Sequence, residues 1–235
     1  MAFMSGRTSL TTVQTGDIAA NAVTTAKILD ATIATGDIAA GIVYQSTNIQ
    51  VFESSGTYTP STDLVYADCI CIGGGASGAQ GGSGKAGGGG GAGSYTRKII
   101  AAGSFGGTET ITIGTGGAGV SGSAAAGVTG TTTSLGSLLT ATAGRGGDAS
   151  SNSGNGGDAS TGDLNVDGGT GGYGDQASTI LNGDGGSTPL GCGSTAGPNT
   201  SGVNRGFGSG AGGASNTNVG PAGSPGVCII VEYIG

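Results

Sequence analysis

Glycine is the feature that most constrains what this chain can fold into. It supplies 57 of the 235 residues, whereas glycine makes up roughly 7% of an average protein. A helical bundle is excluded because each glycine inside a helix costs about 1 kcal/mol relative to alanine. Collagen is excluded because the chain has only five prolines and no sustained Gly-X-Y period. Because only 9% of residues are charged, the sequence predicts a condensed protein rather than an expanded coil.

Several function classes are excluded by composition. The chain has no histidine, so imidazole chemistry is absent. Its net charge is -7 and its few basic residues are scattered, so we expect no nucleic-acid binding. We find no signal peptide and no apolar run of about 18 residues, so we expect no membrane insertion. We expect no enzyme, and we interpret the cysteines, which lack metal-ligand spacing, as small buried residues: Cys69, Cys71, Cys192 and Cys228.

Within residues 1–45, an aliphatic side chain stands at every fifth position from Val13 to Val43, and TGDIAA occurs twice, at 15–20 and 35–40. A period of five fits neither a helix nor a strand, so each unit is predicted to be a short segment plus a turn. One thin chain cannot bury such a stripe, so we predict that several chains share it as an oligomer core. The alternative is a low-complexity linker. The stripe consists of Val13, Ile18, Val23, Ile28, Ile33, Ile38 and Val43.

The segment DIAANAVTTAKILDATIATGDIAAGIV, residues 17–43, resembles the repeats of bacteriophage tail-fibre and receptor-binding proteins. In those fibres such repeats lie in the shaft or in the part next to the virion. The resemblance implies a homotrimer, and it implies that residues 1–45 form a shaft or a virion-attachment region that contacts other virion proteins.

Residues 46–235 are predicted to form a mainly β head. Short runs rich in β-branched residues are separated by Gly, Pro or Ser. Both faces of 64–72 are largely apolar, which predicts a central strand covered on both sides. The apolar run 226–234 is predicted to return to the sheet that 49–72 begins, with the glycine-rich region inserted between them. The other predicted strands are 95–101, 109–113 and 135–142.

Residues 144–226 are rich in glycine and poor in aliphatic side chains, so no ordinary core can form there. Without side chains, backbones can pack directly as extended left-handed helices of three residues per turn. Hydrogen bonds between neighbouring segments would satisfy the backbone and offset the entropy that glycine loses on folding. The predicted fold is therefore a fibrous shaft followed by a β-sandwich-like head with inserted polyglycine-II-like helices or loops.

The order of landmarks in the head also matches a known family. FESSGTYTPSTDLVYADCICIGGGASG is followed by GGGGGAGSYTRKI, TITIGTGGAG, LLTATAGRGG and finally PAGSPGVCIIVEYIG. This order is similar to the glycine-rich domain at the C-terminal end of many phage tail-fibre and tail-collar proteins, and it covers about residues 50–235. The resemblance implies a virion protein that is assembled in the host cytoplasm.

One motif suggests a metal site. Asp163, Asn165, Asp167 and Gly168 form D-x-N-x-D-G, the opening of a calcium loop, although the twelfth position is Gly174 rather than a bidentate glutamate. The alternative, which Asp-Gly pairs favour, is that these side chains bond the backbone of turns. Calcium is thus the candidate ion, and no other cofactor is expected.

Tyr173 and Phe207 are the aromatic residues of the 144–226 region. Since a glycine bundle has little room for a ring, we expect both on loops or at the surface, where they could stack on a glycan or an outer-membrane protein loop. The alternative is that each ring caps the bundle. Polar contacts to the receptor are predicted from Asp175, Arg205, Asn204 and Asn182.

Together these observations predict a phage tail fibre or adhesin that attaches to a bacterial surface through loops of its head. The first alternative is a structural capsid or tail decoration without receptor binding. The second is a non-viral, ice-binding-like glycine-rich protein, which the five-residue repeat argues against.

Overall fold

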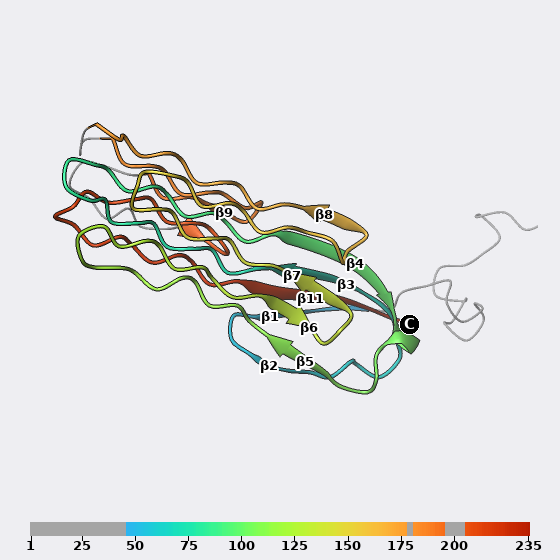
Figure 1. The fold of residues 1–235 in the computed structure, drawn as a ribbon. Coiled ribbons are helices and arrows are strands. Elements are labelled where there is room, and N and C mark those ends of the chain that lie inside the picture. Colours follow the sequence, from blue (N-terminus) through green and yellow to red (C-terminus); the bar gives the residue numbers. More distant parts are fainter. Residues whose placement is uncertain (1–45, 178–180, 196–204) are drawn as a thin grey trace, which may run out of the picture. The chain divides into compact units, whose positions relative to one another are not determined.

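The computed structural model describes residues 46–177, 181–195 and 205–235, which belong to one compact unit, and Figure 1 shows its fold. The predicted oligomer core, Val13 to Val43, lies outside the described residues, as does Asn204. No helix in these ranges is long and apolar enough to cross a membrane.

The unit is built on two antiparallel sheets that pack face to face. The larger sheet has the order β1 (Ser46–Phe52), β11 (Val227–Ile234), β3 (Leu64–Ile72), β4 (Tyr95–Ala101) and β8 (Leu164–Val166). The second has the order β2 (Gly56–Tyr58), β5 (Glu109–Thr112), β6 (Thr133–Leu135) and β7 (Leu139–Ala141). A small sheet pairs β9 (Gly191–Cys192) with β10 (Arg205–Gly206), and a 3-10 helix, η4, spans Ala102–Ser104.

The hydrophobic core lies between the two sheets. Every second residue of β3 and β11 points inward, because side chains alternate along a strand. Facing residues of the second sheet complete a sandwich, as predicted. The buried cluster comprises Tyr58, Ala67, Cys69, Cys71, Ile100, Ile111, Ile113, Leu135, Leu139, Ala141, Cys228 and Ile230.

Several strand predictions are confirmed. β3 and β4 have the predicted bounds, and the C-terminal strand β11 pairs with both β1 and β3. One prediction is wrong: residues 135–142 do not form a single strand, because the chain turns between β6 and β7 at Gly136, whose φ is +48°. A second correction concerns β3, whose outward-facing Tyr66 and Ile70 are only half-buried, since no second layer within the described residues covers that face.

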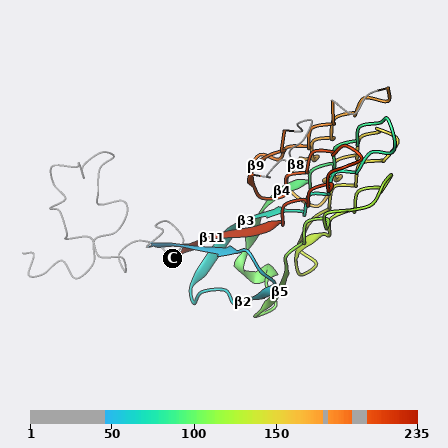
Figure 2. The same ribbon diagram turned by 90° about the vertical axis from the view of Figure 1, so that its left-hand side faces the viewer.

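Beyond the sheets, the strands continue into parallel rows of extended glycine-rich segments, and both Figure 1 and Figure 2 show strands at one end and these segments at the other. Along 73–81 the amides donate to three different neighbours in rotation. Gly73, Ala76 and Ala79 donate to the 88–94 segment, whereas Gly74, Ser77 and Gln80 donate to 125–131. Gly75 and Gly78 donate to Ser224 and Pro221. A three-residue rotation is the pattern of polyglycine II, as predicted.

Two segments, 73–81 and 86–94, form the centre of this bundle and are buried along their whole length. Their neighbours leave no room for side chains. A Cβ on Gly91 would collide with the carbonyl of Asn155, and one on Gly78 with that of Gly212. Glycine is therefore required by backbone-to-backbone packing rather than by turn geometry.

The bundle begins earlier than the sequence predicted. It includes 73–94 and 114–132 as well as most of 144–226. The sequence predicts a boundary at 144 because aliphatic residues are frequent before it. Those residues lie in short strands that alternate with glycine segments. The backbone stays extended as it passes from each strand into the bundle.

Candidate functional site

The bundle ends, away from the sheets, in a group of turns and their flanking residues that we call the tip: 82–85, 121–124, 149–151, 173–177, 181–182 and 215–219. Figure 1 shows these turns together at one end of the molecule. Rigid elements that end in loops are the usual way in which folds present binding residues.

Buried polar side chains connect the turns of the tip to each other. The Gln80 Nε2 donates to the Asn216 carbonyl at 2.8 Å, and its Oε1 accepts from the Gly122 amide at 2.6 Å. The Ser151 hydroxyl donates to the carbonyls of Ala86, at 2.8 Å, and Asp175, at 3.2 Å. Two segments distant in sequence thus share each of these side chains, which fixes the turns relative to one another.

Two turns of the tip contain a non-glycine residue in an unfavourable backbone conformation. Ala124 and Ser151 have φ values of 60° and 77°, in the left-handed region that glycine ordinarily occupies. This conformation costs roughly 1–2 kcal/mol per residue. Since such strain persists only where its surroundings enforce it, these two turns have a defined rather than an adaptable backbone.

Of the predicted receptor-binding residues, the structure brings three to the tip. Tyr173 is 73% exposed. Asp175 is half-buried, and its Oδ1 accepts from the Ala177 amide at 2.9 Å, forming an Asx turn. Asn182 is buried, so it is placed to shape the turn rather than to meet a large ligand directly.

The other predicted residues lie elsewhere. Phe207 follows β10, near the sheet end, and is half-buried. The carbonyl of the neighbouring Gly208 accepts from the Gly93 amide, whereas the carbonyl of Ala214, next to the tip, accepts from the Gly87 amide. At about 3.1 Å per residue, residues 208 and 214 are roughly 19 Å apart. Arg205 belongs to β10, and its side chain is not among those described.

Two aliphatic residues at the tip, Leu181 and Val219, were not among the predicted site residues. Leu181 is 68% exposed, and Val219 is exposed as well. Val219 has no other Leu, Ile or Val within seven residues on either side, and that isolation is the sequence signal that identifies it. Leu181 directly follows Ile180, so its sequence gives no such signal.

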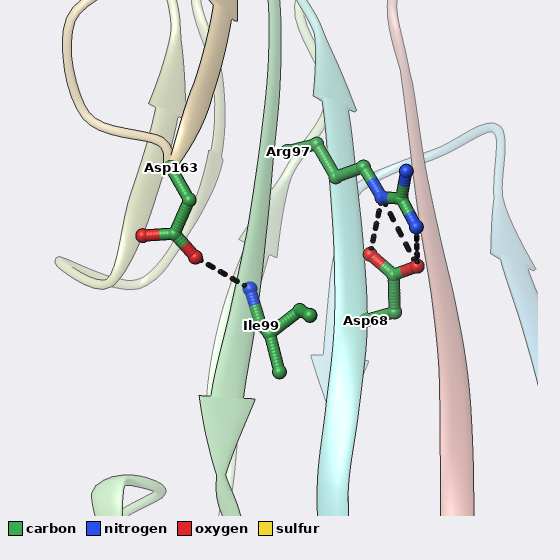
Figure 3. A network of polar contacts seen from close by, with 4 residues as sticks. All are labelled: Asp68, Arg97, Ile99 and Asp163. Carbon is green, nitrogen blue, oxygen red and sulfur yellow. Dashed lines mark hydrogen bonds and ion pairs between the residues drawn. The ribbon is translucent and has the colours of Figure 1, made fainter.

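The predicted calcium ligands each bond a different backbone segment. Asp163 Oδ2 accepts from the Ile99 amide at 3.0 Å (Figure 3), Asp167 Oδ1 from the Ala159 amide at 2.7 Å, and Asn165 Oδ1 from the Gly162 amide at 2.9 Å. Nowhere in the described ranges do three or more His, Cys, Asp or Glu side chains gather as metal ligands. These bonds favour the turn interpretation, and the calcium site stays a prediction.

The buried ionisable groups lie in the sandwich, not at the tip. Glu232 is fully buried and accepts hydrogen bonds from Asn48, Gln50, Tyr58 and Ser61. Burial alone would raise its pKa, but these bonds outweigh it, and the pKa lies below the ordinary value of 4.5. The carboxylate therefore stays ionised and joins β1, β2 and β11.

The buried thiols are in the same sandwich. Burial raises the pKa of Cys69, and the bond to Cys228 together with burial raises that of Cys71. The Sγ atoms of Cys71 and Cys228 are 3.5 Å apart across β3 and β11. Protonated buried thiols are poor nucleophiles, which agrees with their interpretation as small core residues. Cys192 differs, since it is exposed.

Comparison with known proteins gives a family. A model of a glycine-rich domain matches residues 50–233, which spans the sandwich and the bundle together. No curated protein matches the chain. Since this match covers most of the chain, the protein belongs to the glycine-rich domain family.

Proposed function

We propose that this protein is a phage tail fibre or adhesin, a virion protein that attaches to a bacterial surface glycan or outer-membrane protein through the tip. One observation carries the proposal: exposed Tyr173, Leu181 and Val219 lie at the tip, where the buried side chains of Gln80 and Ser151 join neighbouring segments. Aromatic side chains that are already positioned lose little entropy when they bind.

The oligomer belongs to the same proposal. In a homotrimer joined through residues 1–45, three tips would face a repetitive cell surface, so weak single contacts would add to strong attachment. The sequence resemblance to phage fibres supports this assembly and its attachment to other virion proteins.

Tyr173→Ala combined with Leu181→Ser is expected to lower the binding of the purified protein to susceptible bacteria at least tenfold, because both side chains are lost from the contact area. Binding is measured with fluorescently labelled protein on a panel of bacterial strains. Val128→Ser is the matched control, since Val128 is an exposed aliphatic residue on the bundle flank, opposite Ser77 rather than at the tip.

If the unmodified protein binds a strain and the double variant binds equally well, the tip is not the adhesive site. If the unmodified protein binds no strain in the panel and does not block infection, a structural virion component is the better account.

A further inference from the structure

The larger sheet has one face that the sandwich does not cover, which we call the outer face. Its exposed members come from three strands: Ile49 and Val51 of β1, Ile99 of β4, and Leu164 and Val166 of β8. Ile49 is 63% exposed and Ile99 is 58% exposed. Single exposed aliphatic residues are ordinary, but a set on one sheet face marks an interaction surface.

Strand register shows that these residues form continuous rows. Ile49 lies opposite Val231, and Ile99 lies opposite Asp68, which in turn pairs with Val231. In the next row Val51, Ile229 and Ile70 are aligned, followed by Arg97 and Leu164. The rings of Tyr66 and Tyr233 stack beside them, with centroids 4.5 Å apart. Directly opposed residues share a face, so all five strands contribute aliphatic side chains to the outer face, with the Asp68–Arg97 pair among them.

The charges on this face cancel. Arg97 Nε donates to Asp68 Oδ1 at 2.8 Å, and its NH2 group donates to Asp68 Oδ2 at 2.6 Å, so the two form a bidentate ion pair (Figure 3). The hydrogen bonds to Asp68 raise the pKa of Arg97, which stays charged. Such a face offers no charge excess to a nucleic acid or an anionic membrane.

In the larger sheet, the edge of β4 beyond β8 is protected, whereas the outer face is uncovered. β8 pairs with β4 only as far as Arg97, and the Asp163 carboxylate then bonds the next outward amide, that of Ile99 (Figure 3). An unpaired edge amide would otherwise be available to another strand. Any partner on this side must therefore engage the side chains of the face.

We propose that the outer face packs against the same face, or a neighbouring part of it, on other copies of this chain. The inference rests on the oligomer in the proposed function. The aliphatic stripe predicted to join the chains ends at Val43, three residues before β1 begins at Ser46. Copies joined there hold their β1 strands at high effective concentration, and β1 carries Ile49 and Val51. Packing at the sheets also leaves the tips, at the other end of the bundle, free to bind.

The test uses the full chain with Ile49→Glu and Ile99→Glu combined. Both side chains are largely exposed in a single copy, so folding should be retained, as melting temperature will show. The dissociation constant of the oligomer, measured by dilution in analytical ultracentrifugation, is expected to rise about 100-fold, because burial of two aliphatic side chains is lost and charge is placed in the interface. Val219→Glu makes the same change on an exposed residue of the tip and is expected to leave assembly unchanged.

Hydroxyl-radical footprinting of the unmodified oligomer tests the face independently of assembly through residues 1–45. Ile49, Val51 and Ile99 are expected to be protected, whereas the comparably exposed Leu181 and Val219 react freely. The proposal is overturned if the unmodified chain is monomeric, or if Ile49 and Ile99 react as fast as Leu181. Neither result bears on cell binding by the tip, which the Tyr173 and Leu181 variants test separately.

Discussion

Replacing Gly91 by alanine is expected to destabilise the head by about 3–5 kcal/mol, or to prevent folding altogether. The new Cβ would collide with the backbone carbonyl of Asn155, at the centre of the bundle. A flexible side chain could move aside, but a backbone segment that is bonded to its neighbours cannot move without breaking those bonds. Gly91 itself donates to the carbonyl of Arg145. The measurement is the free energy of unfolding in urea.

Gly82→Ala is the matched control for this prediction. Gly82 lies in a turn of the tip, and a Cβ there meets only the Cβ of Ala124 at 3.6 Å, an ordinary contact. Its replacement is expected to change stability by less than about 1 kcal/mol. Equal effects of the two substitutions would show that position within the bundle does not matter, contrary to the packing described above.

Glu232→Gln is expected to destabilise the head by about 2–4 kcal/mol. Oε1 accepts from the Tyr58 hydroxyl and the Ser61 amide, both at 2.8 Å, whereas Oε2 accepts from Asn48 at 2.7 Å. The side chain of glutamine has only one acceptor oxygen, so its NH2 group would have to face donors that the second carboxylate oxygen now accepts from. Glu53→Gln, on an exposed residue at the end of β1, is the control and is expected to change stability little.

The same carboxylate predicts a dependence on pH. The pKa of native Glu232 lies below 4.5, so its contribution to stability is complete above that ordinary value. It is lost as the pH falls through the native pKa, because protonation removes an acceptor from the buried network. Urea unfolding between about pH 7 and pH 3 should therefore show a steeper loss in the unmodified protein than in Glu232→Gln. Parallel curves would mean that Glu232 titrates alike in the folded and unfolded states.

Local sequence patterns predicted much of the sandwich. β3 and β4 could be located because their runs are long and bounded by Gly or Ser, and β11 because its apolar run closes the chain. β2 and β8 escaped prediction because each has three residues, too few to show alternation. The hairpin at Gly136 escaped because Leu135, Leu138 and Leu139 look like one apolar run when the turn between them is ignored.

The site was less predictable, because it depends on which turns meet in space. Tyr173 and Asp175 were found as unusual residues in a glycine region, but Phe207 looked equivalent in sequence and lies near the sheets. Glu232 was missed because a single acid in VCIIVEYI suggests an outward side chain. Its register opposite Asn48 and Ala67 turns it inward, and the donors that bind it come from residues far apart in sequence.

The glycine-rich segments form a hydrogen-bonded bundle that supports the tip. Hydrogen exchange of backbone amides, resolved to short peptides, measures how rigid that bundle is. We predict that amides of 73–81 and 86–94 exchange as slowly as those of β3 and β11, because each is buried and donates to a neighbouring segment. Exchange of these amides at random-coil rates, while the strands stay protected, would show that the glycine segments do not form a stable bundle.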